Sequence, residues 1–239
     1  MAENQIKSDL PQALVKAKGF WDKYSRKIII VGVALIVISG AYFGYKYLYK
    51  QPNEQKASEL IFPAEKLFGK MASTSSYNKD TVNIVLNGGN LEGIPITGLL
   101  KIINNYGGTP SGNRAQYIAG ACYLQLKDFD KAIKFLKDFD GKGANQVQSK
   151  DYIMLGHAYS EKKNTEEALS YYKKAATIAD NDEGMAVEAL YIAGRYADEM
   201  GRTRDAIELF QQIKDKYPTS QRAQSGDADK YLAKLGVIK

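Results

Sequence analysis

The sequence predicts an all-α fold in which one transmembrane helix near the N-terminus precedes an α-solenoid of helix hairpins. Two observations lead to this prediction. The first is a run of 18 residues without charge, from Ile28 to Tyr45. The second is a pattern of small and aromatic residues that recurs three times after residue 113, at a spacing that suits a pair of packed helices. Together they indicate a repetitive domain tethered beside a membrane.

The apolar run is long enough to cross a bilayer, because a helix rises about 1.5 Å per residue and the hydrocarbon core is roughly 30 Å thick. Lys27 and Lys46 bound the run. A cleaved signal peptide is the alternative, but the charged segment before the run is long for one, and no A-x-A motif follows it. We therefore expect an uncleaved transmembrane helix at residues 28–49.

The flanking charges predict the orientation of this helix. Six basic residues precede it and three follow closely: Lys7, Lys16, Lys18, Lys23, Arg26 and Lys27 before, and Lys46, Lys50 and Lys56 after. Lys and Arg are retained on the cytoplasmic side of a membrane. The basic tail at residues 1–27 should therefore be cytoplasmic, with the large C-terminal part outside the cytoplasm.

Small residues in the apolar run offer room for close contact with another membrane helix. Gly32, Gly40 and Gly44 are the candidates, and the last two have the G-x-x-x-G spacing. The tail before the run has apolar residues at helical spacing, with Asp9 as a candidate cap. Such an amphipathic helix could lie on the lipid surface or dock on a protein, and the sequence leaves both open.

The positive charge of the chain belongs to its membrane-proximal part. Residues 1–50 carry eight basic and three acidic side chains, a net charge of +5. The remaining 189 residues carry 25 basic and 24 acidic side chains, a net charge of +1. Because that domain has no basic excess to neutralise phosphates, we expect no nucleic acid among its partners. The tail instead suits anionic membrane lipid.

Three repeat units can be aligned on Ala132, Ala168 and Ala206, and each alanine has a glycine twelve residues before it. Tyrosines, leucines and phenylalanines surround these positions, and Pro218 ends the last unit. The pattern resembles that of the tetratricopeptide repeat (TPR), in which two antiparallel helices cross at small residues and aromatic residues fill the gaps. We expect three TPR units at residues 113–219.

The remaining segments extend the array at both ends. Residues 50–112 should form a linker helix and a degenerate repeat, because the stretch from Leu99 to Gln116 parallels the one from Leu209 to Gln224. Within this region, residues 73–95 are expected to be mostly loop, with one short helical piece near Tyr77–Leu86 and with Gly88 and Gly89 in a turn. Residues 220–239 should form the polar C-terminal capping helix that a solenoid requires.

The residues give no indication of catalysis, of a metal site or of a cofactor. The domain has one histidine and one cysteine, both inside repeat helices. Cys122 is expected to be a small core residue. His157 follows the repeat glycine Gly156, and no metal-ligating partner accompanies it at a recognisable spacing. We therefore predict that the protein is not an enzyme.

Function in stacked helix pairs is normally carried by the concave face, which the first helix of each unit lines. That register predicts a groove of aromatic, basic and acidic side chains suited to a peptide or a partner helix. The alternative is that each of these side chains is simply solvated. The candidates are Arg114, Tyr117, Lys150, Ile153, His157, Glu188, Tyr191 and Arg195.

Over nearly its whole length the chain resembles the YfgM family of ancillary subunits of the Sec translocon. The similarity lies in the basic tail, the single span, the aromatic exit from Tyr42 to Tyr47, the stretch Gln55 to Ser58 and the repeats. The motif Ile61 to Glu65 and the segment Tyr106 to Asn113 look like versions from Bacteroidota. The repeats are more regular than in the proteobacterial members, and residues 73–98 look like an addition.

This resemblance implies a chaperone-like accessory of the SecYEG channel in the bacterial inner (cytoplasmic) membrane, with its repeat domain in the periplasm. The implied partners are the channel, a membrane-anchored prolyl isomerase of the PpiD type and emerging secretory chains. A second hypothesis is an inner-membrane TPR scaffold that assembles envelope or secretion machinery. The family offers no catalytic residues to transfer.

Overall fold

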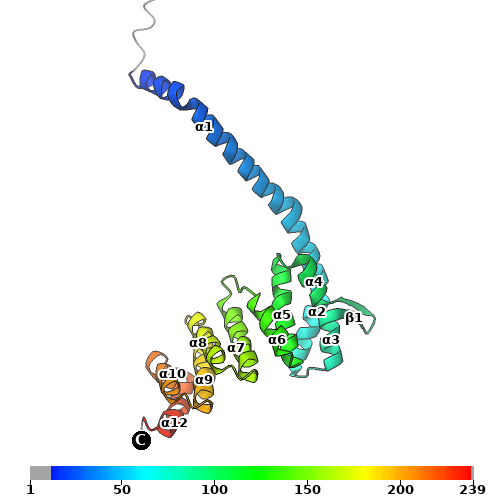
Figure 1. Cartoon of the computed structure of the whole chain (residues 1–239), viewed down its shortest axis with the longest axis vertical. Coiled ribbons are helices and arrows are strands. Elements are labelled where there is room, and N and C mark those ends of the chain that lie inside the picture. Colours follow the sequence, from blue (N-terminus) through cyan, green and yellow to red (C-terminus); the bar gives the residue numbers. More distant parts are fainter. Residues whose placement is uncertain (1–11, 238–239) are drawn as a thin grey trace, which may run out of the picture. The chain divides into compact units, whose positions relative to one another are not determined.

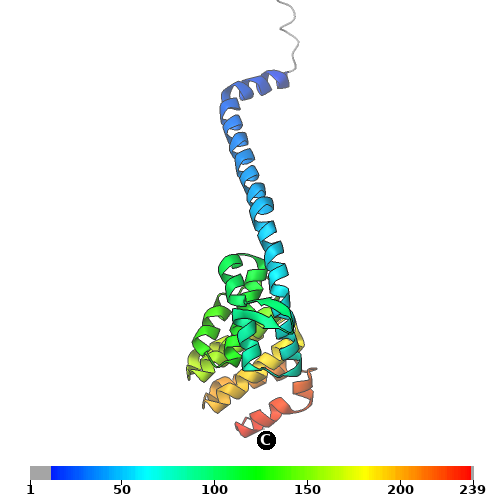
Figure 2. The ribbon, with the colours of Figure 1, turned by 90° about the vertical axis from the view of Figure 1, so that its right-hand side faces the viewer.

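The computed structural model describes residues 12–237, which fall into a unit ending at Asn53 and a unit beginning at Glu54. In the first unit, α1 (Gln12–Gly44) is followed by a π-helix, η1 (Tyr45–Lys50). Figure 2 shows a bend within the first turns of α1. Asp9, the predicted cap of the tail helix, lies outside the described residues.

The apolar run of α1 has the length and composition of a membrane-spanning helix, and its side chains are exposed. It is the one such helix among the described residues, and it is compatible with a single-pass membrane anchor. A Cβ added at Gly32, Gly40 or Gly44 would meet no atom within 4 Å, so these glycines are open on the helix surface.

The second unit consists of helices with one small hairpin (Figure 1). Its N-terminal part contains α2 (Gln51–Thr74), α3 (Lys79–Asn87), the strands β1 (Gly88–Leu91) and β2 (Ile94–Thr97), and α4 (Leu99–Tyr106). The three repeat units follow as α5 (Pro110–Gln125) with α6 (Phe129–Lys137), α7 (Asn145–Glu161) with α8 (Thr165–Ile178), and α9 (Glu183–Glu199) with α10 (Thr203–Lys216). The chain then forms α11 (Gln221–Gln224) and α12 (Asp227–Lys234).

The antiparallel hairpin corrects the prediction of a loop with a glycine turn at this place. Gly88 pairs with Thr97, and Gly89 pairs with Ile96. Glycine is needed here for backbone conformation and for close approach of the backbone: Gly88 has a φ of 90°, and a Cβ on Gly98 would lie 2.3 Å from the carbonyl carbon of Asn87. Glycine-rich sequence is common to turns and to such contacts, so composition alone could not separate them.

Repeat glycines lie where the two helices of each unit cross. A Cβ on Gly156 would come within 2.3 Å of the Tyr172 ring, and one on Gly194 within 2.9 Å of the Phe210 ring. The corresponding contact of Gly120 is with Leu136. These contacts explain why the first helix of each unit carries a glycine where the second helix carries a large residue.

The turn between the two helices of each unit has the same backbone geometry. Lys127, Lys163 and Gly201 all have positive φ, at 60°, 59° and 69°. The N–H of the next residue closes the turn on a carbonyl of the first helix, as Asn164 does on Tyr159 at 3.0 Å. Two lysines thus occupy a left-handed conformation that favours glycine.

The C-terminal capping segment is two helices rather than the single helix that was expected. The break falls at Gly226, whose φ of 73° no continuous helix allows. The buried core also has two parts: one cluster extends from α2 to α7, and the other includes α8, α9, α10 and α12. Cys122 is fully buried in the first cluster, as predicted.

Candidate partner-binding surface

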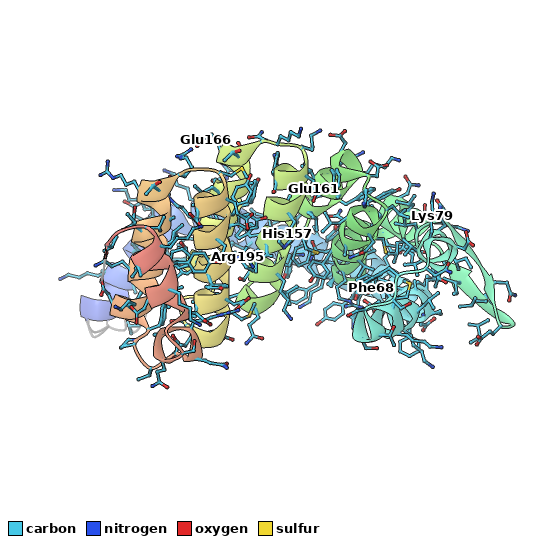
Figure 3. All side chains as sticks on the ribbon, turned by 90° about the horizontal axis from the view of Figure 1, so that it is seen from below. Phe68, Lys79, His157, Glu161, Glu166 and Arg195 are labelled. Atoms are coloured by element: carbon cyan, nitrogen blue, oxygen red, sulfur yellow. The ribbon has the colours of Figure 1, made fainter. Side chains whose placement is uncertain are left out.

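The candidate groove residues lie on the first helices of the three units, α5, α7 and α9. Figure 3 shows two of them, His157 on α7 and Arg195 on α9, at corresponding places on adjacent helices. Each follows the repeat glycine of its own helix by one residue. Contacts between α5 and α7, and between α7 and α9, bring the three helices together along one side of the array.

On α5, the two candidates are already engaged inside the domain. The Nε of Arg114 donates to Glu65 Oε1 of α2 at 2.8 Å, and its Nη2 donates to Ser111 Oγ at 3.3 Å. The ring of Tyr117 is half-buried and packs against Phe139 at 5.1 Å between centroids. Burial raises the pKa of Tyr117, and the nearby carboxyl of Asp151 raises it further.

On α7, the candidates differ in exposure. Lys150 is exposed, and no acidic group of the described residues pairs with it. Ile153 is partly buried against the second core cluster. His157 shares a 2.9 Å hydrogen bond between its Nδ1 and the Tyr172 hydroxyl. Desolvation by the surrounding helices lowers the pKa of His157, so its ring is neutral at pH 7.

On α9, the candidates meet residues of the C-terminal cap. Glu188 Oε2 lies 2.9 Å from Arg222 Nη2, and the Arg222 guanidinium lies 3.8 Å from the centre of the Tyr191 ring. Tyr231 packs edge-on against Tyr191 at 5.8 Å. Arg195 is exposed, and its one ion pair with a described residue is a 3.3 Å contact with Glu199 on its own helix.

Three contributors to this surface were missed by sequence reasoning, namely Glu65, Arg222 and Tyr231. A signal for one of them was present, because Arg222-Ala223-Gln224 parallels Arg114-Ala115-Gln116. Both arginines pair with a glutamate from a neighbouring helix. Glu65 and Tyr231 carried no such signal, because their roles depend on how α2 and α12 pack against the array.

The surface offers several groups that suit protein binding. It offers exposed cations at Lys150 and Arg195, an exposed imidazole and partly buried tyrosines. Among residues 12–237, no group of three or more His, Cys, Asp or Glu side chains could hold a metal ion. Tyrosine and arginine are the residues that most often anchor protein partners. The fold and this surface therefore define a protein-interaction module built from helical repeats.

Comparison with known proteins identifies the repeats. Residues 114–140 and 188–220 match one tetratricopeptide repeat family, and residues 152–182 match another. The chain thus carries three tetratricopeptide repeats, which coincide with the pairs α5 and α6, α7 and α8, and α9 and α10. No curated protein matches the chain.

Among solved structures, the chain is similar to a kinesin light chain of Podosopora anserina with nearly identical TPR-like repeats. The two are 13% identical, with a TM-score of 0.49, over 74% of this chain and 93% of the other.

Proposed function

We propose that this protein is a membrane-anchored interaction module that serves as a chaperone-like accessory of the SecYEG channel, together with a PpiD-type prolyl isomerase. The observation that carries the proposal is the combination in one chain of a single apolar helix with three tetratricopeptide repeats. The helix would hold the repeats at the periplasmic surface of the inner membrane. There, the surface of α5, α7 and α9 could meet the isomerase or an emerging chain.

The mixed character of the surface supports a protein ligand. Its exposed cations and half-buried rings can bind acidic and apolar side chains of a peptide without a deep pocket. The glycines of α1 leave room for a second membrane helix, which the channel or the isomerase could provide. The proposal that the N-terminus is cytoplasmic rests on the excess of Lys and Arg before the apolar run.

A pull-down from native membranes tests the proposal. The tagged full-length chain is solubilised in mild detergent, and its stoichiometric partners are identified by mass spectrometry. Recovery of the Sec channel with a prolyl isomerase is the expected result. Recovery of one envelope complex without the channel would overturn it and support the alternative, an inner-membrane scaffold for envelope or secretion machinery.

The groove is best tested by reversing its exposed charges. Alanine at Tyr117 or Tyr191 would remove internal packing, whereas Lys150 and Arg195 are exposed. The Lys150→Glu/Arg195→Glu variant should lose the partner. The matched control is Lys101→Glu/Arg204→Glu, with exposed cations on second helices, which should keep it. Equal partner recovery by both variants would place the binding surface elsewhere.

A further inference from the structure

A polar cleft lies between the first two repeat units, behind the α5 and α7 part of the groove, and Phe139, which lines it, packs against Tyr117. It has a volume of about 300 Å³ and is lined by the end of α6, the segment after it, and one side each of α7 and α8. Its walls include the side chains of Lys137, Lys174, Tyr171 and Asp151. None of the eight residues proposed for the groove lines it.

Asp151 is the unusual group in this cleft, because it is a carboxyl group that is 99% buried and only half satisfied. Its Oδ2 accepts a hydrogen bond from Gln148 Nε2 at 3.1 Å, while its Oδ1 has no partner among the described residues. Gln148 also accepts from the N–H of Gly141 at 2.7 Å, which fixes the segment after α6. A buried oxygen without a partner is costly, so its retention calls for an explanation.

Two lysines at the cleft have no acidic partner within the described part of the chain. Lys174 Nζ lies 4.5 Å from the centre of the Tyr171 ring, and Lys137 Nζ lies 5.3 Å from that of Tyr159. These two rings are stacked on each other at 5.5 Å. An aromatic pair thus holds two ammonium groups beside the cleft without neutralising them.

Glu167 lies near enough to Lys137 to raise the pKa of that lysine, without an ion pair between them among the described residues, and a second carboxylate lies at the cleft itself. Asp140 lines it, but its Oδ1 accepts a hydrogen bond from the N–H of Lys142 at 2.9 Å. Burial raises the pKa of Asp151 to about 8, so at neutral pH this group is mostly a neutral acid. A protonated Oδ1 would be a hydrogen-bond donor. The side chains of Lys137, Lys174, Asp151 and Asp140 thus line one cleft, with two cations, one buried acid and one carboxylate among them.

We propose that the cleft between α6, α7 and α8 is a second binding site, which takes the carboxylate of an acidic side chain presented by a partner protein. Lys137 and Lys174 attract the carboxylate, and Asp151 donates to one of its oxygens. Charge complementarity favours this occupant over a lysine or arginine, which both ammonium groups would repel. The site goes beyond the function proposed for the groove and leaves that surface free.

Fluorescence anisotropy with the full-length chain in detergent tests the site. The probe is a labelled peptide of alternating glutamate and serine with blocked ends, and peptides with glutamine or lysine in place of glutamate serve as comparisons. The glutamate peptide should bind at low salt, and the other two should not. Preference for the lysine peptide, or absence of binding by the glutamate peptide, would overturn the proposal.

Matched variants locate the binding. The Lys137→Gln/Lys174→Gln variant removes the two exposed cations of the cleft and should weaken binding about tenfold or more. Lys101→Gln/Lys134→Gln removes the same charge outside the cleft and should change binding by less than about twofold. Equal losses in both variants would mean diffuse attraction and would reject the site. Asp151→Asn keeps a donor at the position and should retain binding, so its failure to bind would also count against the proposal.

Discussion

Glu54 in α2 accepts two hydrogen bonds from Ser111 in α5, although 57 residues separate them. The backbone N–H of Ser111 lies 2.9 Å from Oε2, and its hydroxyl lies 2.7 Å from Oε1. Ser111 is the second residue of α5, so the carboxylate lies at the positive end of that helix. The first helix after the apolar segment is thereby joined to the first repeat.

Replacing Glu54 tests the strength of this connection. Glu54→Gln removes the charge from a helix N-terminus and weakens two charge-assisted hydrogen bonds. We expect the free energy of unfolding to fall by about 1–2 kcal/mol in urea denaturation followed by circular dichroism. Glu59→Gln, at an exposed position of the same helix, is the control. If the two variants are equally stable, the contact between Glu54 and Ser111 contributes little.

Glycine 156 should not tolerate even a methyl group. A Cβ there would overlap the Tyr172 ring, which is buried and therefore has little room to move. Gly156→Ala should therefore lower the free energy of unfolding by about 2 kcal/mol, as measured by thermal or urea denaturation. Gly69→Ala, at a helical position where an added Cβ meets nothing within 4 Å, should be neutral or slightly stabilising. Equal effects would contradict the close packing of the crossing.

Replacing Lys127 or Lys163 with glycine should stabilise the folded protein. Both residues have positive φ, which costs a non-glycine residue roughly 1 kcal/mol, offset in part by the greater freedom of glycine in the unfolded chain. We expect each of Lys127→Gly and Lys163→Gly to raise the melting temperature. Lys162→Gly, beside the second turn but at negative φ, should lower it. If all three changes lowered the melting temperature, the positive φ of Lys127 and Lys163 would not be a significant cost to stability.

The buried carboxyl of Asp151 should make stability depend on pH. Its pKa is raised in the folded state, to about 8 from an ordinary value of 3.8, because burial disfavours the charged form. Between about pH 4 and pH 8, Asp151 is protonated in the folded protein and ionised in the unfolded chain. The contribution of Asp151 to the free energy of unfolding is therefore full below about pH 4 and is lost as the pH rises toward 8. Asp151→Asn removes this loss. The free energy of unfolding of Asp151→Asn, relative to that of the wild type, should rise by about 1.4 kcal/mol per pH unit from pH 5 to pH 8 and then level off.

Denaturant unfolding at a series of pH values measures this difference directly. Asp138→Asn, which changes an exposed carboxyl after α6, is the control and should show no comparable trend over this range. A constant difference between Asp151→Asn and wild type would mean that Asp151 is ionised in the folded protein at neutral pH. That result would also remove the buried donor from the proposed cleft.

The repeats could be predicted from the sequence because each unit carries its own packing information. Gly156 and Tyr172 are the helix-crossing glycine and one aromatic residue of a known pattern, and they meet as that pattern requires. The hairpin was not predicted, because Gly88 and Gly98 act through backbone contacts that arise only when their two segments pair. Burial of Cys122 could be expected because a free cysteine is usually buried.

The candidate surface was predictable only in part, for the same physical reason. Helical periodicity places Lys150, His157 and Arg195 along the first helices, and it says nothing about their partners. The ion pair of Arg114 with Glu65 and the stacking of Arg222 on Tyr191 join segments whose relative position is set by tertiary packing. The cleft around Asp151 was not anticipated, because an aspartate in an amphipathic helix reads as a solvated residue.

The division of the core into two clusters bears on how the protein would respond to mechanical load. If one end is held in a bilayer and a bound partner pulls on the other, tension passes through the repeat units in series. Helix α7 contacts both clusters. It buries the polar side chains of Ser149 and Asp151 at positions where a repeat core is usually apolar. We expect such a joint to yield before either cluster does, because the Oδ1 of Asp151 is buried there without a partner among the described residues. The domain would lengthen by opening at α7, as two intact halves, and could close again when the load is released.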